Sequence, residues 1–200
     1  MYLDAAQLEH KELYKILIAA VSPRPIAWAG TRSREGHDNL APFSFYNVFS
    51  ARPPIVGFAP IPHEDGSPKD TLRNIEDSGC FTLSCVSHRL VKQMSRSSAL
   101  LAHGESEFAH AGLSAAQGRS VNAPYVAESP VVFECRLQQV LRFGEAPGGG
   151  CLVLGEITHL HIDDDIYQDG RLDLDELDTV GRLAGNWYCT IRDRFEMQRG

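Results

Sequence analysis

Hydrophobic residues recur at helical spacing close to the start of the chain. Leu13, Ile16 and Leu17 would share one side of a helix covering about residues 8–18. Pro23 and Pro25 follow shortly afterwards and cannot continue a helix, because proline lacks a backbone N–H. The pattern therefore predicts a short opening helix, and we expect it to pack across the mouth of a barrel formed by the rest of the chain.

Segments with strand character follow this helix. A first strand is expected at residues 26–31, a polar hairpin connection with Gly36 comes next, and a second strand is expected at residues 40–49. Pro42 lies inside the second strand. Because proline cannot donate a hydrogen bond to a neighbouring strand, Pro42 predicts a bulge or a sheet edge there. Irregular backbone of this kind leaves neighbouring N–H groups free for a ligand.

The rest of the chain continues the strand pattern. The sequence predicts strands at 55–59 and 81–86, a helix at 88–98, an irregular stretch at 100–126, a hairpin of long strands at 131–143 and 151–162, and a short helix near Leu174 and Leu177. Strands outnumber helices and do not alternate regularly with them, which favours a mainly β, antiparallel barrel over a doubly wound sheet. Gly148, Gly149 and Gly150 join two strands instead of opening a helix, so they do not form a dinucleotide-binding fingerprint.

Composition limits the classes of protein that fit. The chain has 200 residues, 43% of them hydrophobic, which suits one domain over residues 1–200. Its net charge of -7 disfavours nonspecific binding to nucleic acid or anionic lipid. No apolar run approaches the roughly 20 residues of a membrane span, and no leader pattern opens the chain, so a cytoplasmic protein is expected. Five cysteines without Cys-x-x-Cys spacing argue against a disulfide framework or a zinc knuckle.

A predicted helix start provides a candidate anion site. Ser67 has a capping hydroxyl, Pro68 suits the first helical position, and Asp70 is an acid at the third. Lys69 and Thr71 then fall in the first turn. Unpaired backbone N–H groups at a helix N-terminus carry partial positive charge, and a lysine and a hydroxyl beside them suit a phosphate dianion. The alternative is that Asp70 only completes a capping box and that Lys69 is a solvated charge.

Three motifs stand out along the chain, at residues 22–31 (SPRPIAWAGT), 39–47 (NLAPFSFYN) and 67–74 (SPKDTLRN), with further motifs at 105–113, 126–135 and 182–188. Their order resembles that of the flavin reductase-like proteins, which carry FMN in a split β-barrel. The resemblance covers nearly the full chain. The implied fold is an antiparallel Greek-key split β-barrel with a few short peripheral helices. Residues 100–104 depart from the proline-containing loop expected in the family, and this loop is expected to border the active site.

The resemblance also implies a set of cofactor-binding residues. Within the matched segments Asn39, Ala41 and Ser44 would contact the flavin ring, and Lys69, Thr71 and Asn74 would hold the phosphate or the ribityl chain. The full set of expected cofactor-binding residues is Arg24, Thr31, Asn39, Leu40, Ala41, Ser44, Asn47, Lys69, Asp70, Thr71, Asn74, Arg182, Asn186 and Tyr188. Flavin chemistry requires no protein nucleophile, so no catalytic side chain is expected.

Two groups of residues have competing interpretations. Phe43, Phe45 and Tyr46 could line a flavin slot or fill a barrel core. His159 and His161 would share one face of a strand and could bind a metal with an acid from residues 163–165. Solvated strand histidines are the simpler interpretation, because no third ligand can be identified, and no metal site is assigned.

The function implied by the resemblance is an FMN-dependent oxidoreductase. NADH or NADPH would act as a transient co-substrate, stacking on the flavin in an open cleft under residues 100–126, and electrons would pass to free flavin or another acceptor. A homodimer is expected. The first alternative is a non-enzymatic FMN carrier, similar to flavoredoxin, that exchanges electrons with a redox partner protein. The second is a split barrel that has lost its flavin.

Overall fold

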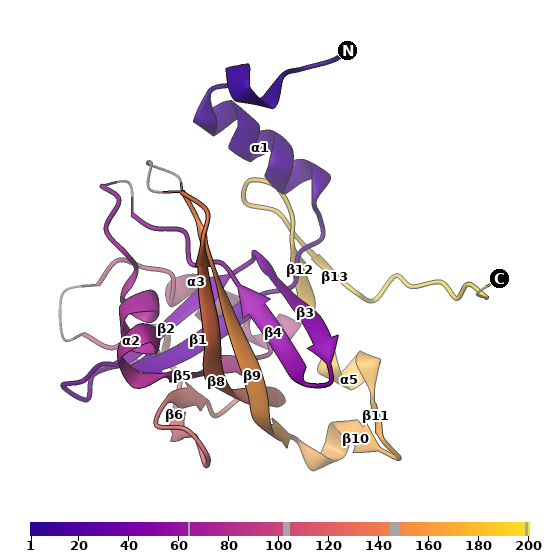
Figure 1. Cartoon of the computed structure of the whole chain (residues 1–200). Coiled ribbons are helices and arrows are strands. Elements are labelled where there is room, and N and C mark those ends of the chain that lie inside the picture. The colour runs from indigo at the N-terminus through magenta and orange to yellow at the C-terminus, as the bar shows by residue number, and fades with distance from the viewer. Residues whose placement is uncertain (64, 102–104, 145–148, 199) are drawn as a thin grey trace.

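The computed structural model describes residues 1–63, 65–101, 105–144, 149–198 and 200. Its main feature is an antiparallel sheet with the strand order β2-β1-β5-β8-β9-β4-β3. These strands are β1 (Ala27–Arg32), β2 (Asp38–Phe43), β3 (Tyr46–Ala51), β4 (Pro54–Phe58), β5 (Cys80–Ser84), β8 (Val131–Arg142) and β9 (Cys151–Ile162). The long strands β8 and β9 pair as predicted and cross the centre of Figure 1. Gly148, between them in sequence, lies outside the described residues.

The connection from β2 to β3 requires the sheet to curl. These strands occupy opposite edges of the sheet, yet only Ser44 and Phe45 separate them in sequence. An extended chain advances at most about 3.6 Å per residue, so this connection spans roughly 11 Å and must bring the two edges together. Within the described residues no hydrogen-bonded ladder joins β2 to β3, which leaves the barrel split along this seam. The predicted antiparallel split barrel is confirmed.

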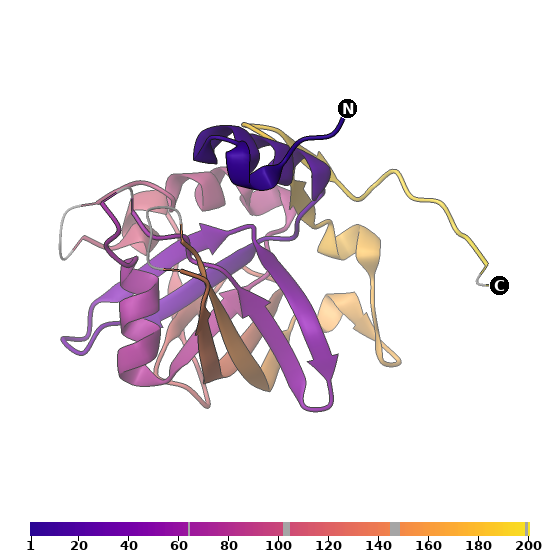
Figure 2. The ribbon, with the colours of Figure 1, turned by 45° about the horizontal axis from the view of Figure 1, so that its top comes forward.

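Short helices and small strand pairs surround the barrel. α1 (His10–Ala20) lies across one end of it (Figure 2), and α2 (Asp70–Ser78) packs beside β1 (Figure 1). The other elements are η1 (Ala5–Gln7), η2 (His88–Leu90), α3 (Val91–Arg96), α4 (Glu107–Ala111), β6 (Ala115–Gln117), β7 (Pro124–Val126), η3 (Asp164–Ile166), β10 (Tyr167–Gln168), β11 (Arg171–Leu172), α5 (Leu174–Leu177), β12 (Val180–Arg182) and β13 (Tyr188–Thr190), where η marks a 3₁₀-helix. None of the helices in the described part of the chain has the length and apolar character to cross a membrane.

Strand β1 separates two hydrophobic clusters. Ala27 and Ala29 face the barrel interior, where the rings of Phe58 and Phe81 meet edge to face with centroids 5.6 Å apart. Trp28, which is fully buried, faces the other way into a cluster that includes α3 and α4 residues. Side chains of a strand alternate between its two faces, so one strand serves both clusters. Phe43 and Tyr46 also pack, partly buried, against this interior.

The second predicted strand differs from the structure. Residues 40–49 belong to two strands, β2 and β3, at opposite edges of the sheet. Pro42 lies opposite Trp28 on the edge strand β2, which agrees with the edge that Pro42 predicts. The interruption comes later, at Ser44 and Phe45, because the chain must leave one edge there to reach the other. A hydrophobic pattern cannot reveal this change of partner strand.

The predicted start of α2 is also corrected. Lys69 is the N-cap, and the first helical residue is Asp70. Ser67 does not cap the helix, because its hydroxyl and its N–H both donate to the Asp65 carboxylate, at 2.6 and 2.9 Å. Pro68 disfavours the helical conformation for the residue before it, which places Ser67 outside the helix. Gly79 ends the helix as predicted, with φ 69° and its N–H donating to the Ile75 carbonyl.

The stretch expected to be irregular contains regular structure. α4, β6 and β7 all fall within residues 100–126. Strand β7 packs across β1 and β5, where the Thr82 hydroxyl donates to the Pro124 carbonyl at 2.5 Å. These elements have only three to five residues each, so tertiary contacts decide their structure and local patterns do not predict them. Residues 102–104 of the predicted active-site loop lie outside the described residues.

Candidate functional site

Two adjoining cavities lie along the edge strand β2. The first, here the α2 cavity, has a volume of about 340 Å³ and lies between β2 and the start of α2. The second, here the β12 cavity, has a volume of about 390 Å³ and lies between α1, α3 and the β12–β13 hairpin. Both volumes fall in the range of about 300–1,000 Å³ that is typical of ligand pockets. The cavities share the wall residues Tyr14, Pro42, Phe43, Ser44 and Ser98, so they adjoin each other, and the two together are called the cleft here.

A hydrogen-bonded network supports the polar end of the α2 cavity. The Asn39 amide on β2 donates to Thr31 Oγ1 and to Thr71 Oγ1, each at 3.0 Å. From the second turn of α2, the Asn74 amide donates to the same Thr31 oxygen at 3.1 Å. Thr31 and Asn74 are buried behind the cavity wall, whereas Asn39 lines it together with Thr71, which is itself only 1% exposed. The network therefore fixes the start of α2 against β2 and orients the Thr71 hydroxyl.

Positive groups lie beside this network. Lys69 lines the cavity, and its Nζ lies 3.1 Å from Nδ1 of His63, which reaches the cavity from the loop before α2. Among the described residues, no hydrogen-bond acceptor is found for the backbone N–H of Asp70 or Thr71, the first two positions of α2. Free N–H groups of this kind carry the positive end of the helix dipole. The α2 cavity thus presents several donors that suit an anion.

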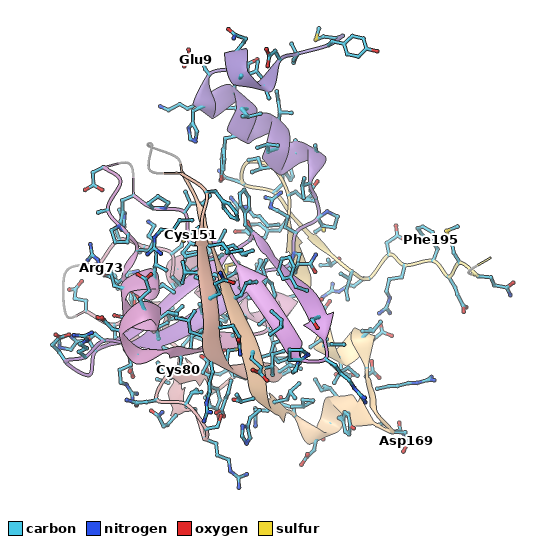
Figure 3. The ribbon with its side chains drawn as sticks, in the orientation of Figure 1. Glu9, Arg73, Cys80, Cys151, Asp169 and Phe195 are labelled. Atoms are coloured by element: carbon cyan, nitrogen blue, oxygen red, sulfur yellow. The ribbon has the colours of Figure 1, made fainter. Side chains whose placement is uncertain are left out.

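Two carboxylates border the same region. Asp70 is largely exposed and pairs with Arg73, which Figure 3 labels beside α2, at 3.2 Å. Glu107 on α4 is half-buried and accepts a hydrogen bond from the Leu40 N–H at 3.1 Å. Burial raises the pKa of Glu107, its backbone hydrogen bonds oppose this shift, and the charge of Asp70 adds to it. Glu107 is more buried than Asp70, and its charged form is disfavoured by that burial.

Apolar residues form part of the wall of the α2 cavity. Ala41, Pro42 and Phe43 of β2 form one wall, and Ala99 and Leu101 contribute to another. Leu40 directs its N–H to Glu107, and the next position facing the same way is Pro42, which has no N–H. This part of the sheet edge therefore cannot continue into another strand, and the cleft beside it stays open.

The β12 cavity has a different character. Arg24 is buried, and its guanidinium donates to the carbonyls of Ile18, Val21 and Leu183 at 2.5, 2.6 and 3.1 Å. These bonds join the end of α1 to the β12–β13 hairpin. Burial lowers the pKa of Arg24 below its usual value. Arg182, Asn186 and Tyr188 complete the wall formed by the hairpin.

Comparison with known proteins identifies the family. A model of the flavin reductase like domain matches residues 20–174. This chain belongs to the flavin reductase-like family. It is 40% identical to an uncharacterized protein of Halalkalibacterium halodurans, and the match covers 100% of this chain and 96% of the relative. It is 35% identical to the uncharacterized protein YwrF of Bacillus subtilis, and that match covers 100% of this chain and 99% of the relative.

Solved structures of flavin reductase-like proteins share the same fold. Nitrilotriacetate monooxygenase component B from Bacillus cereus is 28% identical with a TM-score of 0.94, and the match covers 98% of each chain. The 2-nitrobenzoate 2-nitroreductase NbaA from Pseudomonas fluorescens is 25% identical with a TM-score of 0.88, covering 100% of this chain and 96% of that chain. A putative flavin reductase with a split barrel domain from Shewanella frigidimarina is 25% identical, with a TM-score of 0.84 and full coverage of both chains. Family and neighbours together support a flavin-related function of the oxidoreductase type with a flavin cofactor.

The structure brings most of the expected cofactor-binding residues of this flavin reductase-like protein into the cleft. Asn39, Ala41, Ser44, Lys69, Asp70 and Thr71 line the α2 cavity, and Arg24, Ser44, Arg182, Asn186 and Tyr188 line the β12 cavity. Thr31, Leu40 and Asn74 are buried behind the wall. Asn47 lies apart from these residues. It is exposed on β3, and its side chain accepts a hydrogen bond from the Val48 N–H at 2.8 Å.

Several lining residues were not predicted as site residues. Tyr14 reaches both cavities from α1, His63 comes from the loop before α2, and Glu107 comes from α4. Glu107 falls within the matched segment 105–113, so the resemblance marked its neighbourhood without giving it a role. Leu100 and Leu101 line the α2 cavity, which places the described part of the predicted active-site loop beside it.

The two strand histidines lie away from the cleft residues. His159 and His161 are exposed on β9. Nε2 of His161 is 3.7 Å from the Asp163 carboxylate, and the imidazole ring lies 5.7 Å from the ring of Tyr125. Within the described ranges, no group of three or more potential metal ligands is found.

Proposed function

We propose that this protein binds FMN in the cleft and catalyses NAD(P)H-dependent reduction of flavin or of another acceptor. The observation that carries the proposal is that the α2 cavity combines hydrogen-bond donors with an apolar wall. The donors at the start of α2 lie at one end of this cavity, and the apolar wall of β2 follows directly. A ribityl phosphate needs a compact anion site, and an isoalloxazine needs a flat apolar slot beside it. The α2 cavity offers both in the required order.

The phosphate would lie at the N-terminus of α2. The Thr71 oxygen accepts a hydrogen bond from Asn39, which leaves its hydroxyl proton for a ligand oxygen. Lys69 supplies a positive charge, and the N–H groups of Asp70 and Thr71 supply two more donors. The Asp70 carboxylate opposes an anion, but it is 70% exposed and paired with Arg73. The donors therefore outweigh the acid at this end of the cavity.

The flavin ring would lie along β2. Ala41 and Pro42 present small apolar surfaces, and Phe43 packs on the barrel interior behind them, so this wall is rigid. Bound FMN supplies hydride and electron transfer. The protein residues bind and orient the ring and exclude water from one face. Flavin chemistry does not require any of them to act as a nucleophile.

We further propose that the protein forms a homodimer. α1 has no buried side chain within one chain, and the exposed fractions of Ile16 and Leu17 are 41% and 47%. A helix of this length is marginal in water without a packing partner. Covering α1 by a second copy would bury these residues beside the cleft. Equilibrium sedimentation at micromolar concentration tests this proposal: a dimer is expected, and a monomer alone would contradict it.

The second candidate function is an FMN carrier that exchanges electrons with a protein partner. The same exposed face of α1 favours it, because a redox partner would cover that face near the cleft. Steady-state oxidation of NADH and NADPH with added FMN separates the two functions. Turnover well above background with either donor supports the enzyme. Tight FMN binding with background turnover supports the carrier.

The visible spectrum of the freshly purified protein, before and after anaerobic addition of NADH, tests the shared basis of both functions. Flavin absorption that is bleached by NADH is expected for the enzyme. A colourless preparation that also fails to bind added FMN would remove both redox functions and leave a split barrel without flavin.

A further inference from the structure

Three polar residues of the β12 cavity are cross-strand neighbours. Arg24 and Arg182 form a pair of backbone hydrogen bonds. The Arg24 N–H donates to the Arg182 carbonyl at 3.0 Å, and the Arg182 N–H donates to the Arg24 carbonyl at 2.8 Å. Arg182 is in turn opposite Tyr188 in the β12–β13 ladder. Directly opposed residues of antiparallel strands project their side chains to the same face. The backbone therefore directs all three side chains to one side, and all three line the cavity.

The two arginines form an uncompensated pair of positive charges. In the described part of the chain, neither has a carboxylate partner, and no Asp or Glu lines the β12 cavity. Like charges directly opposite each other in a sheet are destabilising. Burial lowers the pKa of Arg24, and the charge of Arg182 adds to this effect. This local excess of positive charge, in a protein of net charge -7, makes the β12 cavity suited to an anion.

The hydrogen bonds of these residues leave most of the free donors on Arg182. Arg24 uses four of its five N–H groups, three on backbone carbonyls near α1 and the hairpin and one, at 3.4 Å, on the Ser44 hydroxyl. Arg182 donates to the Tyr188 hydroxyl and to the Gly185 carbonyl, and its guanidinium lies over the Tyr188 ring. Arg182 thus retains three N–H donors, and Tyr188 retains its hydroxyl proton.

We propose that the β12 cavity binds the oxyanion of the second substrate, a carboxylate or phosphate group, and that Arg182 and Tyr188 contact it. Arg24 contributes its charge and holds the hairpin in place. This inference rests on the proposed function, because it requires FMN to occupy the α2 cavity. It differs from the sequence-based expectation that Arg182 and Tyr188 contact the flavin. The oxyanion could come from an aromatic carboxylate acceptor or from a phosphate of the nicotinamide donor, and the test distinguishes these sources.

The test uses FMN-loaded protein and follows the flavin absorption spectrum during titration. Benzoate is the carboxylate probe, benzamide is its neutral counterpart, and adenosine 2′,5′-bisphosphate is the phosphate probe. We expect at least one anionic probe to bind and benzamide to bind more weakly. Binding of benzoate alone indicates a carboxylate acceptor, and binding of the bisphosphate alone indicates the nicotinamide donor. Equal binding of benzoate and benzamide, or no binding of either anion, would overturn the inference.

Substitutions assign the effect to the named residues. Arg182→Gln is expected to weaken the anionic probe roughly 10- to 100-fold, and Tyr188→Phe is expected to weaken it several-fold. Arg171→Gln, an exposed arginine on β11, is the matched control and should leave probe binding unchanged. FMN binding by each variant reports that the fold and the α2 cavity are intact.

The outcomes separate this inference from the proposed function. If unmodified protein binds FMN and Arg182→Gln leaves the anionic probe unaffected, the inference alone is wrong. If Arg182→Gln weakens FMN far more than riboflavin, the β12 cavity holds the FMN phosphate itself, and the inference is again wrong. If the protein binds no FMN at all, the proposed function is wrong and the inference falls with it.

Discussion

The side-chain amide of Asn39 donates to the Thr71 hydroxyl oxygen at 3.0 Å, joining the edge strand β2 to the first turn of α2. The same amide donates to the buried Thr31, so one side chain connects two strands and a helix. This contact decides which way the Thr71 hydroxyl proton can point. It is therefore the link between the barrel and the proposed phosphate site.

Replacing this amide should affect both stability and cofactor affinity. Asn39→Ala removes the donors to Thr31 and Thr71, and we expect the free energy of unfolding to fall by about 1–2 kcal/mol. Because the Thr71 hydroxyl loses its orientation, FMN affinity should fall roughly 10-fold. Urea unfolding and fluorescence titration with FMN measure the two effects.

Asn47→Ala provides the matched control for Asn39→Ala. Asn47 is exposed on β3, so its loss should change neither stability nor FMN affinity appreciably. If the two variants behave alike, the network around Asn39 does not have the role assigned to it.

Glu107 should limit the affinity for the phosphate. Burial raises its pKa, with a further contribution from Asp70, so Glu107 holds a proton more readily in the folded protein than in the unfolded chain. Protonated Glu107 contributes to stability at pH values below its pKa in the unfolded chain, about 4.3. This contribution is lost as the pH rises through the higher pKa of the folded state. Glu107→Gln keeps an oxygen for the Leu40 N–H and removes the negative charge beside the proposed phosphate.

We therefore expect Glu107→Gln to bind FMN roughly threefold to tenfold more tightly near neutral pH. Riboflavin, which lacks the phosphate, should bind the variant and the unmodified protein equally. Titration with both ligands measures this difference. A gain of the same size for riboflavin would show that the effect is not electrostatic.

Glu134 should make stability depend on pH. It is buried, and burial alone would raise its pKa, but hydrogen bonds from the Ser120 hydroxyl and from the N–H groups of Arg119 and Ser120 outweigh burial and lower it. Because the pKa is lower in the folded state, ionised Glu134 stabilises the protein at pH values above its pKa in the unfolded chain, about 4.3. This stabilisation is lost as the pH falls through the folded-state pKa.

Glu134→Gln should consequently lower the free energy of unfolding by about 1–3 kcal/mol near neutral pH, because a carboxylate is the stronger acceptor. The difference from the unmodified protein should shrink toward about pH 3, where the carboxylate is protonated. Urea unfolding across this pH range measures it. A difference that stays constant with pH would contradict the assignment to charge.

The fold, and the chain segments that form the site, could be predicted from the sequence. The long strands β8 and β9 alternate over enough residues to be recognised, and the segments 39–47 and 67–74 contain Asn39, Lys69 and Thr71, which meet in the structure. The start of α2 was misplaced because Ser67 has capping chemistry but uses it on Asp65. Ser67 can cap a helix, but its local bonds to Asp65 and the neighbouring Pro68 keep it outside the helix.

The remaining site residues have no sequence feature that assigns them to the site. Tyr14 is one aromatic position in an amphipathic helix, and His63 lies in a loop. Glu107 reaches the cavity because α4 packs against β2, a contact between elements far apart in the sequence. Only the folded chain brings these side chains to the same cavity. The pairing of Arg24 with Arg182 has the same origin, since it depends on a backbone bridge between distant segments.

The central claim is that the N-terminus of α2 holds the phosphate of FMN, and the most direct measurement compares FMN with riboflavin in the Lys69→Ala, Thr71→Ala double variant. Each charge-assisted contact contributes about 1.5–3 kcal/mol, so FMN affinity should fall roughly 100-fold or more, with riboflavin affinity nearly unchanged. Lys92→Ala, an exposed lysine on α3, serves as the control. Equal losses for the two ligands, or no loss of FMN affinity, would contradict the claim.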